Sequence, residues 1–181
     1  WDIIKRKQFS LKQDKAKKGF GFFIDMAEVW EQYLRAILKK NLMPYGWRYR
    51  NDKQLAYKGY FFQRELIPDL VFQKENEVAV WDAKYKRMKG RNFDVDRSDF
   101  FQIHTYIQYQ LNHKAVKAGG LLYPISTTPN FDEYQSPNLI NEDGVKMNFS
   151  IDGIELAEKV ENEHHRQSEV EFINRIIKSI S

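Results

Sequence analysis

The sequence has 181 residues, a formal net charge of +4 and no cysteine. This length suffices for one domain with a hydrophobic core. The apolar fraction of 42% is too high for a disordered chain. The lack of cysteine excludes disulfides and thiolate metal sites. No apolar run is long enough to span a bilayer and no signal peptide is recognisable, so we expect a cytoplasmic protein with no membrane partner. The mild positive charge is compatible with an anionic partner.

The amino-terminal segment differs in composition from the rest of the chain. Residues 1–20 are rich in lysine, and we interpret them as a linker or as the remnant of an upstream region. Because the chain begins at Trp1 and not at methionine, we expect it to be a fragment of a longer protein. Residues 21–181 are expected to form one domain.

The first predicted helix follows this segment. Its apolar residues recur at intervals of three and four, which is the spacing of one helix face. Asp25 can cap the amino-terminal end, and the segment 41–46 ends the helix. The spacing predicts an apolar stripe centred near Met26, Tyr33 and Ile37.

Three strand-like segments come next. Aromatic residues alternate roughly from Trp47 to Phe62, and two apolar runs, 66–73 and 78–85, flank the short polar sequence KENE. We interpret KENE as a four-residue hairpin loop. The two runs then pair as antiparallel strands, with the last residue of the first run opposite the first residue of the second.

The second half of the chain alternates between helix and strand. A charged loop leads to a helix that opens at Ser98 or Asp99 and runs to about Lys114. The sequence GGLLYPI predicts a buried strand, which is followed by a polar loop over 126–143, a further strand in VKMNFSI and a last helix over 161–180. This order of elements favours an α/β fold in which helices flank a mixed central sheet.

The proposed hairpin brings two acidic residues together. Counting back from Gln73 and Val78 places Asp69 opposite Asp82, where Cβ atoms are about 4.5–5.5 Å apart. Because side chains alternate along a strand, Lys84 lies on the same face as Asp82. One face of the sheet would then carry two carboxylates and an ammonium group.

Two adjacent carboxylates repel each other unless a positive charge lies near them. Mg²⁺ is a suitable ion because it prefers carboxylate and water oxygens, and we expect Mn²⁺ to substitute for it. Such an ion lowers the pKa of a bound water and polarises a phosphoryl group. We predict that Asp69, Asp82 and the carbonyl of Ala83 bind the metal, and that Lys84 orients the attacking water. The alternative is a surface hairpin in which Asp82 and Lys84 form a solvated pair and Asp69 is a turn residue.

The two parts of this constellation resemble a known nuclease motif. Pro68-Asp69 and Asp82-Ala83-Lys84 are similar to the two parts of the PD-(D/E)xK motif. More narrowly, the chain resembles the C-terminal nuclease domain of McrC, the endonuclease subunit of the modification-dependent McrBC restriction systems. The stretches that carry the resemblance, in order, are FFIDMAEVWEQYL, IPDLVF…VWDAKYK, DFFQIHTYIQY and LLYP. The resemblance implies a restriction-endonuclease-like core and Mg²⁺-dependent hydrolysis of DNA, and it leaves out the last third of the chain.

A third acid is selected on the first helix by two arguments. A helix turns by about 100° per residue, which places Glu31 at the edge of the apolar stripe, beside Leu34 and Leu38, and Glu28 on the exposed side. The resemblance implies the same residue, because the family's helix glutamate follows an aromatic residue, here Trp30. We therefore predict that Glu31 binds the metal or a metal-bound water. The alternative is a glutamate that faces solvent.

The predicted helix after the motif carries a polar stripe of Gln102, Tyr106, Tyr109 and His113. Gln102 and Tyr106 resemble the Q-x-x-x-Y motif of RecB-like nucleases, which implies a place beside the active site. Without that resemblance the stripe is a partly exposed helix face. The basic residues from Lys86 to Arg91 can contact phosphate, although solvated loop charges are the simpler interpretation.

The resemblance also implies two partners. One is DNA, and the other is a GTPase motor of McrB type that recognises modified cytosine and translocates DNA. This chain has no P-loop, so such a motor must be another protein. Two other hypotheses stay open, namely a degenerate nuclease fold that only binds nucleic acid or a partner, and another nuclease of the same fold, such as a resolvase or a RecB-like exonuclease.

Overall fold

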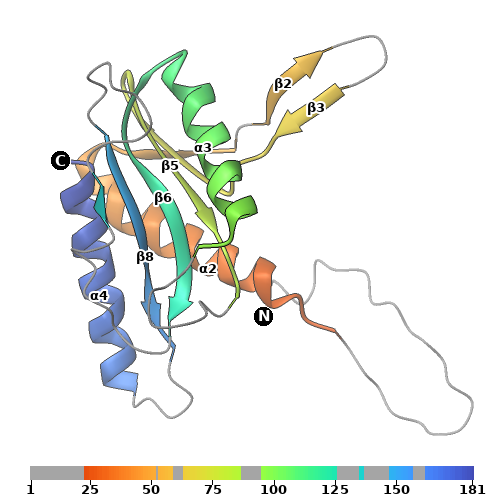
Figure 1. Cartoon of the computed structure of the whole chain (residues 1–181). Coiled ribbons are helices and arrows are strands. Elements are labelled where there is room, and N and C mark those ends of the chain that lie inside the picture. Colours follow the sequence, from red (N-terminus) through yellow and green to blue (C-terminus); the bar gives the residue numbers. More distant parts are fainter. Residues whose placement is uncertain are drawn as a thin grey trace, which may run out of the picture.

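The computed structural model consists of one central sheet with helices on both faces and a separate two-stranded ribbon (Figure 1). The structure describes residues 23–51, 53–58, 63–86, 95–125, 135–136, 147–156 and 162–181. The elements in chain order are α2 (Met26–Leu42), a 3₁₀ turn η1 (Met43–Tyr45), β1 (Arg48–Arg50), β2 (Gln54–Lys58), β3 (Gln63–Leu66), β4 (Leu70–Lys74), β5 (Glu77–Ala83), α3 (Arg97–Leu111), β6 (Ala115–Ile125), β7 (Gln135–Ser136), β8 (Asn148–Glu155) and α4 (Asn162–Ser179).

The central sheet is mixed. Its strand order is β1-β4-β5-β6-β8-β7. The β5–β6 and β6–β8 pairs are parallel, whereas the other neighbours are antiparallel. Helix α3 forms the crossover between the parallel strands β5 and β6, as parallel pairing requires. The α/β class with a mixed central sheet, predicted from the order of elements, is therefore confirmed.

Helix α2 begins where the sequence predicts, but it buries a different face. The Asp25 carboxylate accepts hydrogen bonds from the Ala27 and Glu28 amides at 3.0 and 3.4 Å, which satisfies amide groups that have no partner within the helix. The predicted centre of the apolar stripe is wrong, because Met26 is exposed while Tyr33 and Ile37 are only half-buried. The buried face consists of Trp30, Leu34, Leu38 and Leu42. Packing against the sheet and α4 selects this face.

The β4–β5 hairpin has the predicted register. Gln73 lies opposite Val78, and the last pair of the ladder is Leu70 with Trp81. The loop is shorter than predicted, because Lys74 and Glu77 also pair and only residues 75–76 form the turn. The positive φ of 50° at Glu75 is compatible with such a tight turn.

The predicted strand over 47–62 is divided between two sheets. Strand β1 pairs with β4, whereas β2 pairs with β3 in a ribbon that extends away from the body (Figure 1). Residues 52 and 59–62 of that prediction lie outside the described residues. The predicted strand 66–73 starts only at Leu70, since Pro68 cannot donate to a ladder hydrogen bond.

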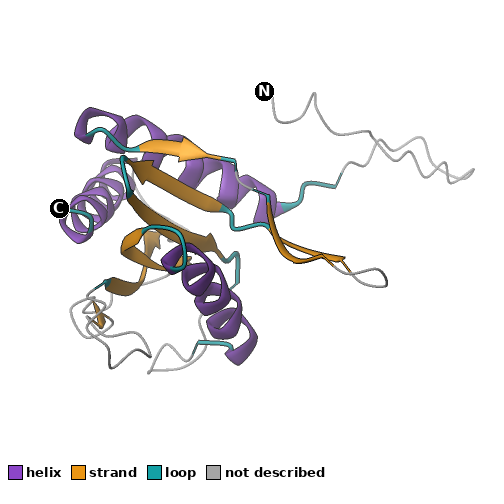
Figure 2. Ribbon diagram, turned by 90° about the horizontal axis from the view of Figure 1, so that it is seen from above, coloured by secondary structure: helices purple, strands orange, loops and turns teal. Residues whose placement is uncertain are grey.

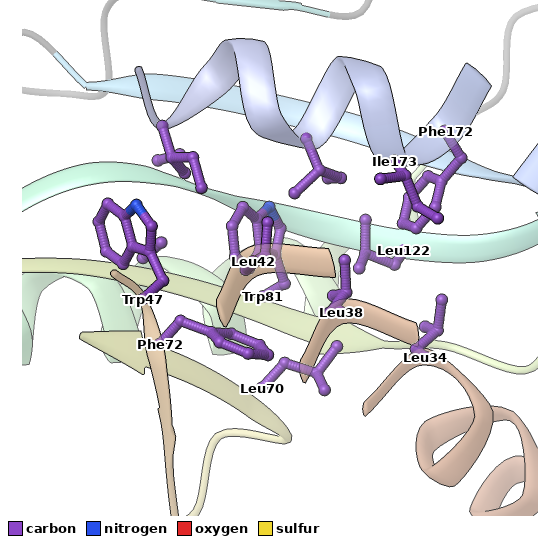
Figure 3. Close-up of a cluster of buried hydrophobic side chains, with 14 of the residues drawn as sticks. Leu34, Leu38, Leu42, Trp47, Leu70, Phe72, Trp81, Leu122, Phe172 and Ile173 are labelled. Atoms are coloured by element: carbon purple, nitrogen blue, oxygen red, sulfur yellow. The ribbon is translucent and has the colours of Figure 1, made fainter. Parts of the chain in front are cut away.

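The core has two layers, one on each side of the sheet (Figure 2). Side chains of α2 and α4 cover one face, where Leu34, Leu38 and Leu42 approach Phe172 and Ile173 over Trp81 (Figure 3). Side chains of α3 cover the other face, on the same side as Val80 and Leu121. Alternate residues of β5 therefore point into different layers, which decides the layer that Asp82 faces.

The last third of the chain completes the fold. The predicted strand near VKMNFSI and the last helix are present as β8 and α4. Asp152 of β8 is 3% exposed and forms a two-point ion pair with Arg175 of α4, at 2.9 Å to Nε and 2.8 Å to Nη2. This pair fixes α4 against the sheet on the face opposite to α3. Of the predicted loop 126–143, only the short strand β7 is described.

Candidate active site

Asp69, Asp82 and Lys84 lie together at one end of the β4–β5 hairpin. Asp69 directly precedes β4, Asp82 is the second-last residue of β5, and Lys84 follows that strand. Continuing the ladder by one step beyond Leu70 and Trp81 brings the two aspartates side by side. The Asp69 carboxylate accepts a hydrogen bond of 2.9 Å from the amide of Ala83, so the amide of the residue between Asp82 and Lys84 holds Asp69 in place.

The ammonium group of Lys84 contacts three acceptors. Its Nζ atom lies 2.5 Å from Asp82 Oδ2 and 3.8 Å from Asp99 Oδ1, and it donates to Gln102 Oε1 at 2.8 Å. The side chains of Asp82 and Lys84 are 1% and 17% exposed. A solvated surface pair, the alternative drawn from the sequence, therefore does not describe these two residues.

The electrostatics of the site show a shortage of positive charge. Burial, and next the charge of Asp69, raises the pKa of Asp82 to about 7. Burial also raises the pKa of Asp69, although the Ala83 amide and the charges of Lys84 and Arg35 partly offset it. Burial alone would lower the pKa of Lys84, but the hydrogen bond to Asp82 and the charges of the nearby aspartates outweigh it and raise that pKa. Lys84 alone does not compensate both acids.

Glu31 lies on α2 near this group. Burial raises its pKa, and the charge of Asp69 is the next largest cause. Arg35, one turn further along α2, forms an ion pair with Glu31 and reaches the carbonyl of Asp69 at 3.5 Å. Glu31 is thus half-buried and pairs with Arg35, which also reaches the backbone of Asp69.

Trp30 anchors α2 at this position. Its indole Nε1 donates a 3.1 Å hydrogen bond to the carbonyl of Leu122 in β6, and the Lys84 amide donates to the same carbonyl at 2.9 Å. One oxygen of β6 therefore fixes both the helix that carries Glu31 and the backbone of Lys84. The sequence marked Trp30 only as the aromatic residue before Glu31.

The polar stripe of α3 is divided in two. Gln102 is exposed and donates from Nε2 to the hydroxyl of Tyr106 at 2.8 Å, while its Oε1 accepts from Lys84. The Tyr106 ring belongs to the core and is only 6% exposed. Tyr109, near the end of α3, and His113, in the turn after the helix, stack on each other with ring centroids 4.8 Å apart. Gln102 contacts Lys84 directly and Tyr106 contacts it only through Gln102, while the role that the Q-x-x-x-Y resemblance implies for them stays a prediction.

The donor atoms fit a hard divalent cation. All of the side-chain atoms that could bind a metal are carboxylate oxygens, which hard cations prefer. Asp82 Oδ2 is buried and accepts no hydrogen bond of normal geometry, and its close neighbour is the Lys84 ammonium at 2.5 Å. Across the described ranges, no group of three or more Asp, Glu, His or Cys side chains is gathered tightly enough to form a metal centre. Asp69 and Asp82 are therefore the residues that could hold a cation directly. Glu31 becomes a third ligand only if Arg35 releases it.

Two residues of the site escaped the sequence analysis. Arg35 follows Glu31 by four positions, a spacing that places both side chains on one helix face and could have predicted the pair. Asp99 is 6% exposed and accepts a 3.2 Å hydrogen bond from the hydroxyl of Tyr123. No local pattern predicts this contact, because it depends on the α3 crossover.

The basic run after the motif is described only at its first residue. Lys86 pairs with Asp99 at 2.5 Å and with Asp96 at 3.6 Å, and its side chain is 43% exposed. Residues 87–94, which include the rest of the basic run, lie outside the described residues, as do residues 1–22, which include the predicted linker. The interpretation of those segments stays a prediction.

With this geometry established, the chain can be compared with known proteins. The family model described as "McrBC 5-methylcytosine restriction system component" matches residues 2–124. The chain belongs to the McrBC family. The resemblance to an McrC-type subunit, predicted from four stretches of sequence, is thereby confirmed, and the matched region contains every predicted site residue from Glu31 to Tyr106.

A solved structure shares the fold of this McrBC family member. It is a chain of the refined half-complex from the tetradecameric assembly of Thermococcus gammatolerans McrB AAA+ hexamers with bound McrC, with a TM-score of 0.52 and 20% identity over 86% of the present chain. The present chain spans only 34% of the length of that chain. Curated proteins gave no match. Among the described helices, none combines the length and apolar character needed to cross a bilayer.

Proposed function

We propose that this chain is the nuclease part of an McrC-type subunit and that it hydrolyses phosphodiester bonds of DNA with Mg²⁺, for which Mn²⁺ can substitute. The observation that carries the proposal is the pair of the buried Asp82 and the half-buried Asp69, with Lys84 beside it and Glu31 nearby on α2. Membership of the McrBC family supports the same conclusion.

The residues divide the chemistry between them. Asp69 and Asp82 would hold the cation, with the Ala83 carbonyl, and Glu31 once Arg35 releases it, as further ligands. When bound, the ion lowers the pKa of a water and polarises the phosphoryl group. Lys84 orients the attacking water and offsets the charge that builds on the phosphate, while Gln102 fixes the direction of the Lys84 ammonium through its 2.8 Å contact.

The proposal includes a motor partner. The structurally similar chain comes from an assembly of McrB AAA+ hexamers with bound McrC, and we infer that the present chain acts with a GTPase of that type. The partner would bring DNA to the site and recognise modified cytosine. An unrestrained nuclease of low specificity would damage the DNA of its own cell, so control by assembly is physically sensible.

The test is nicking of supercoiled DNA with Mg²⁺ or Mn²⁺. The chain alone, the full-length subunit, and the full-length subunit with its GTPase and GTP are compared at equal protein concentration. We expect slow nicking by the chain alone, fast cleavage by the complete assembly, and none by Asp82→Asn variants of either. Equal rates for the chain alone and the assembly would instead support a free-standing nuclease.

One observation favours a second candidate function. Lys84 and Arg35 already pair with Asp82 and Glu31, which is the arrangement expected of a degenerate nuclease fold that binds nucleic acid or a partner without chemistry. Such a domain would bind DNA but would not bind Mn²⁺ through Asp69 and Asp82. Measuring Mn²⁺ binding separates the two functions without any need for the motor.

A further inference from the structure

Asp99 occupies an unusual place for a residue in the first turn of a helix. Acidic residues there commonly face solvent and cap free amides, but in α3 that role belongs to Asp96, whose side chain accepts from the Ser98 amide at 2.8 Å. Asp99 turns inward and is 6% exposed. Helix capping therefore does not explain the buried position of Asp99.

Two groups contact one oxygen of the Asp99 carboxylate. The hydroxyl of Tyr123, which is 1% exposed on β6, donates to Oδ2 at 3.2 Å, and the Lys86 ammonium lies 2.5 Å from the same atom. The other oxygen, Oδ1, faces Lys84. Asp99 is thus fixed by one oxygen and presents the other toward the candidate active site.

Lys84 lies between two carboxylates. Its Nζ atom contacts Asp82 Oδ2 at 2.5 Å and is 3.8 Å from Asp99 Oδ1, while Gln102 Oε1 accepts at 2.8 Å. An ammonium group has only three donors. A small change of the Lys84 side-chain torsions would move its ammonium group from Asp82 toward Asp99, so that Lys84 keeps a carboxylate partner while Asp82 becomes free.

We propose that Asp99 is a positioning residue, which accepts the Lys84 ammonium when the Asp82 carboxylate binds a divalent cation. This inference rests on the proposed function, since it assumes that Asp82 is a cation ligand. Lys84 and the cation compete for Asp82 Oδ2. A buried ammonium that loses its only carboxylate is strongly destabilised, so a second carboxylate within reach lowers the free energy needed to load the cation.

The proposal gives a role to two sequence stretches that the nuclease motif leaves unexplained. Asp99 begins the stretch DFFQIHTYIQY and Tyr123 lies in LLYP. The α3 crossover and strand β6 bring these two residues into contact beside Lys84. Both would serve to keep Lys84 next to the cation site rather than to touch the substrate.

The test is a double-mutant cycle on Mn²⁺ affinity, measured by titration calorimetry. It uses the wild type, Asp99→Asn, Lys84→Gln and the double variant. We expect Asp99→Asn to weaken Mn²⁺ binding about tenfold when Lys84 is present and less than about twofold in the Lys84→Gln protein, because neighbouring charges couple and independent ones do not. Asp96→Asn is the matched control, because it removes one charge from the same helix end and should change the affinity less than about twofold.

Each result has a defined meaning. Equal weakening by Asp99→Asn in both backgrounds would overturn the proposal and leave a general charge effect. If Asp99→Asn does not fold, Tyr123→Phe is used instead, because it removes one hydrogen bond to Asp99 and leaves the charge of Asp99 in place. The effect of Tyr123→Phe on Mn²⁺ affinity must again disappear in the Lys84→Gln protein. Wild type that binds no Mn²⁺, or binding that Asp82→Asn does not reduce, would overturn the proposed function and this inference together. Binding through Asp82 with no coupling between Asp99 and Lys84 would overturn the inference alone.

Discussion

At the scale of single residues, the site is set up by two carboxylates that are unfavourable neighbours without a cation. Burial and the nearby Asp69 raise the pKa of Asp82 to about 7, whereas an aspartate in an unfolded chain has a pKa of about 3.9. The folded protein therefore binds a proton at Asp82 more tightly than the unfolded chain does. Strain of this kind is typical of functional sites, where stability is given up for a reactive arrangement.

This difference predicts how stability changes with pH. Because the folded pKa of Asp82 is the higher one, its contribution to the free energy of unfolding is fully present below the unfolded pKa and is lost as pH rises through about 7. We expect the metal-free protein to lose stability on the order of a few kcal/mol between about pH 4 and pH 8. Urea denaturation at several pH values measures this, and Asp82→Asn should flatten the profile. Parallel profiles for the two proteins would contradict the assignment.

Lys84 should matter for both chemistry and stability. Removing it leaves the buried Asp82 and the half-buried Asp69 without their nearest ammonium, so Lys84→Ala should abolish cleavage and lower the free energy of unfolding by about 2 kcal/mol at pH 8. The loss should be smaller at pH 5, where Asp82 is protonated. Lys117→Ala is a suitable control, because Lys117 belongs to an exposed 3.7 Å pair with Glu77 and such pairs contribute below about 1 kcal/mol. A Lys84→Ala protein as stable as wild type at pH 8 would mean that Asp82 is neutral there.

At the scale of secondary structure, a feature could be predicted when residues close in the sequence determine it, and not when packing between distant elements does. The start of α2 follows from the Asp25 side chain, and the β4–β5 register follows from the position of the polar KENE segment between two apolar runs, so both were predicted correctly. The buried face of α2 was not, because α4 and the sheet select Trp30 and Leu34 over Tyr33. Non-local packing, which a local pattern does not contain, decides that choice.

The same distinction applies to the candidate site. Asp69, Asp82 and Lys84 belong to one hairpin, so their proximity could be derived from its register. Asp99 reaches Lys84 only through the α3 crossover, which no spacing in the sequence encodes. The split of the 47–62 segment between two sheets was missed for a similar reason, since each half pairs with a strand that comes later in the chain.

The anchoring of α2 leads to a prediction at this scale. Trp30→Phe keeps an aromatic ring in the core but removes the hydrogen bond to the Leu122 carbonyl. We expect the free energy of unfolding to fall by about 1–2 kcal/mol, and Mn²⁺ affinity to fall because Glu31 is held less firmly. The matched control is Asp25→Ala, which weakens the same helix at its cap by about 1 kcal/mol. Equal changes of Mn²⁺ affinity in both variants would mean that helix stability, and not the position of Glu31, matters.

At the scale of the whole molecule, the chain divides into a part that contains the candidate site and a part that packs behind it. The family match covers residues 2–124 and includes the candidate site. Strand β8 and helix α4 come later; β8 extends the sheet, and α4 covers the face opposite to α3, where Arg175 pairs with the buried Asp152. The sequence predicted both later elements but assigned them no role, because an ion pair between distant elements leaves no local pattern.

Binding of DNA by this chain alone is expected to be weak. Within the described residues, Lys86 and Gln102 are exposed beside the site and can approach the phosphate backbone, but no element is arranged to read base edges. We expect dissociation constants of about 10⁻⁴–10⁻⁶ M at physiological salt, with steep weakening as salt rises. Fluorescence anisotropy with methylated and unmethylated duplexes measures both properties. Tight binding selective for methylcytosine would contradict the idea that a partner recognises the modification.

We propose above that Asp69 and Asp82 form a cation site and do not serve only as partners of Lys84 in an ion-pair cluster. Titration calorimetry with Mn²⁺ at about pH 8, where ionised carboxylates are favoured, tests it most directly on wild type, Asp69→Asn, Asp82→Asn and the double variant. We expect binding by wild type, at least about tenfold weaker binding by each single variant, and none detectable in the double variant. Equal affinity of the wild type and the double variant would contradict it.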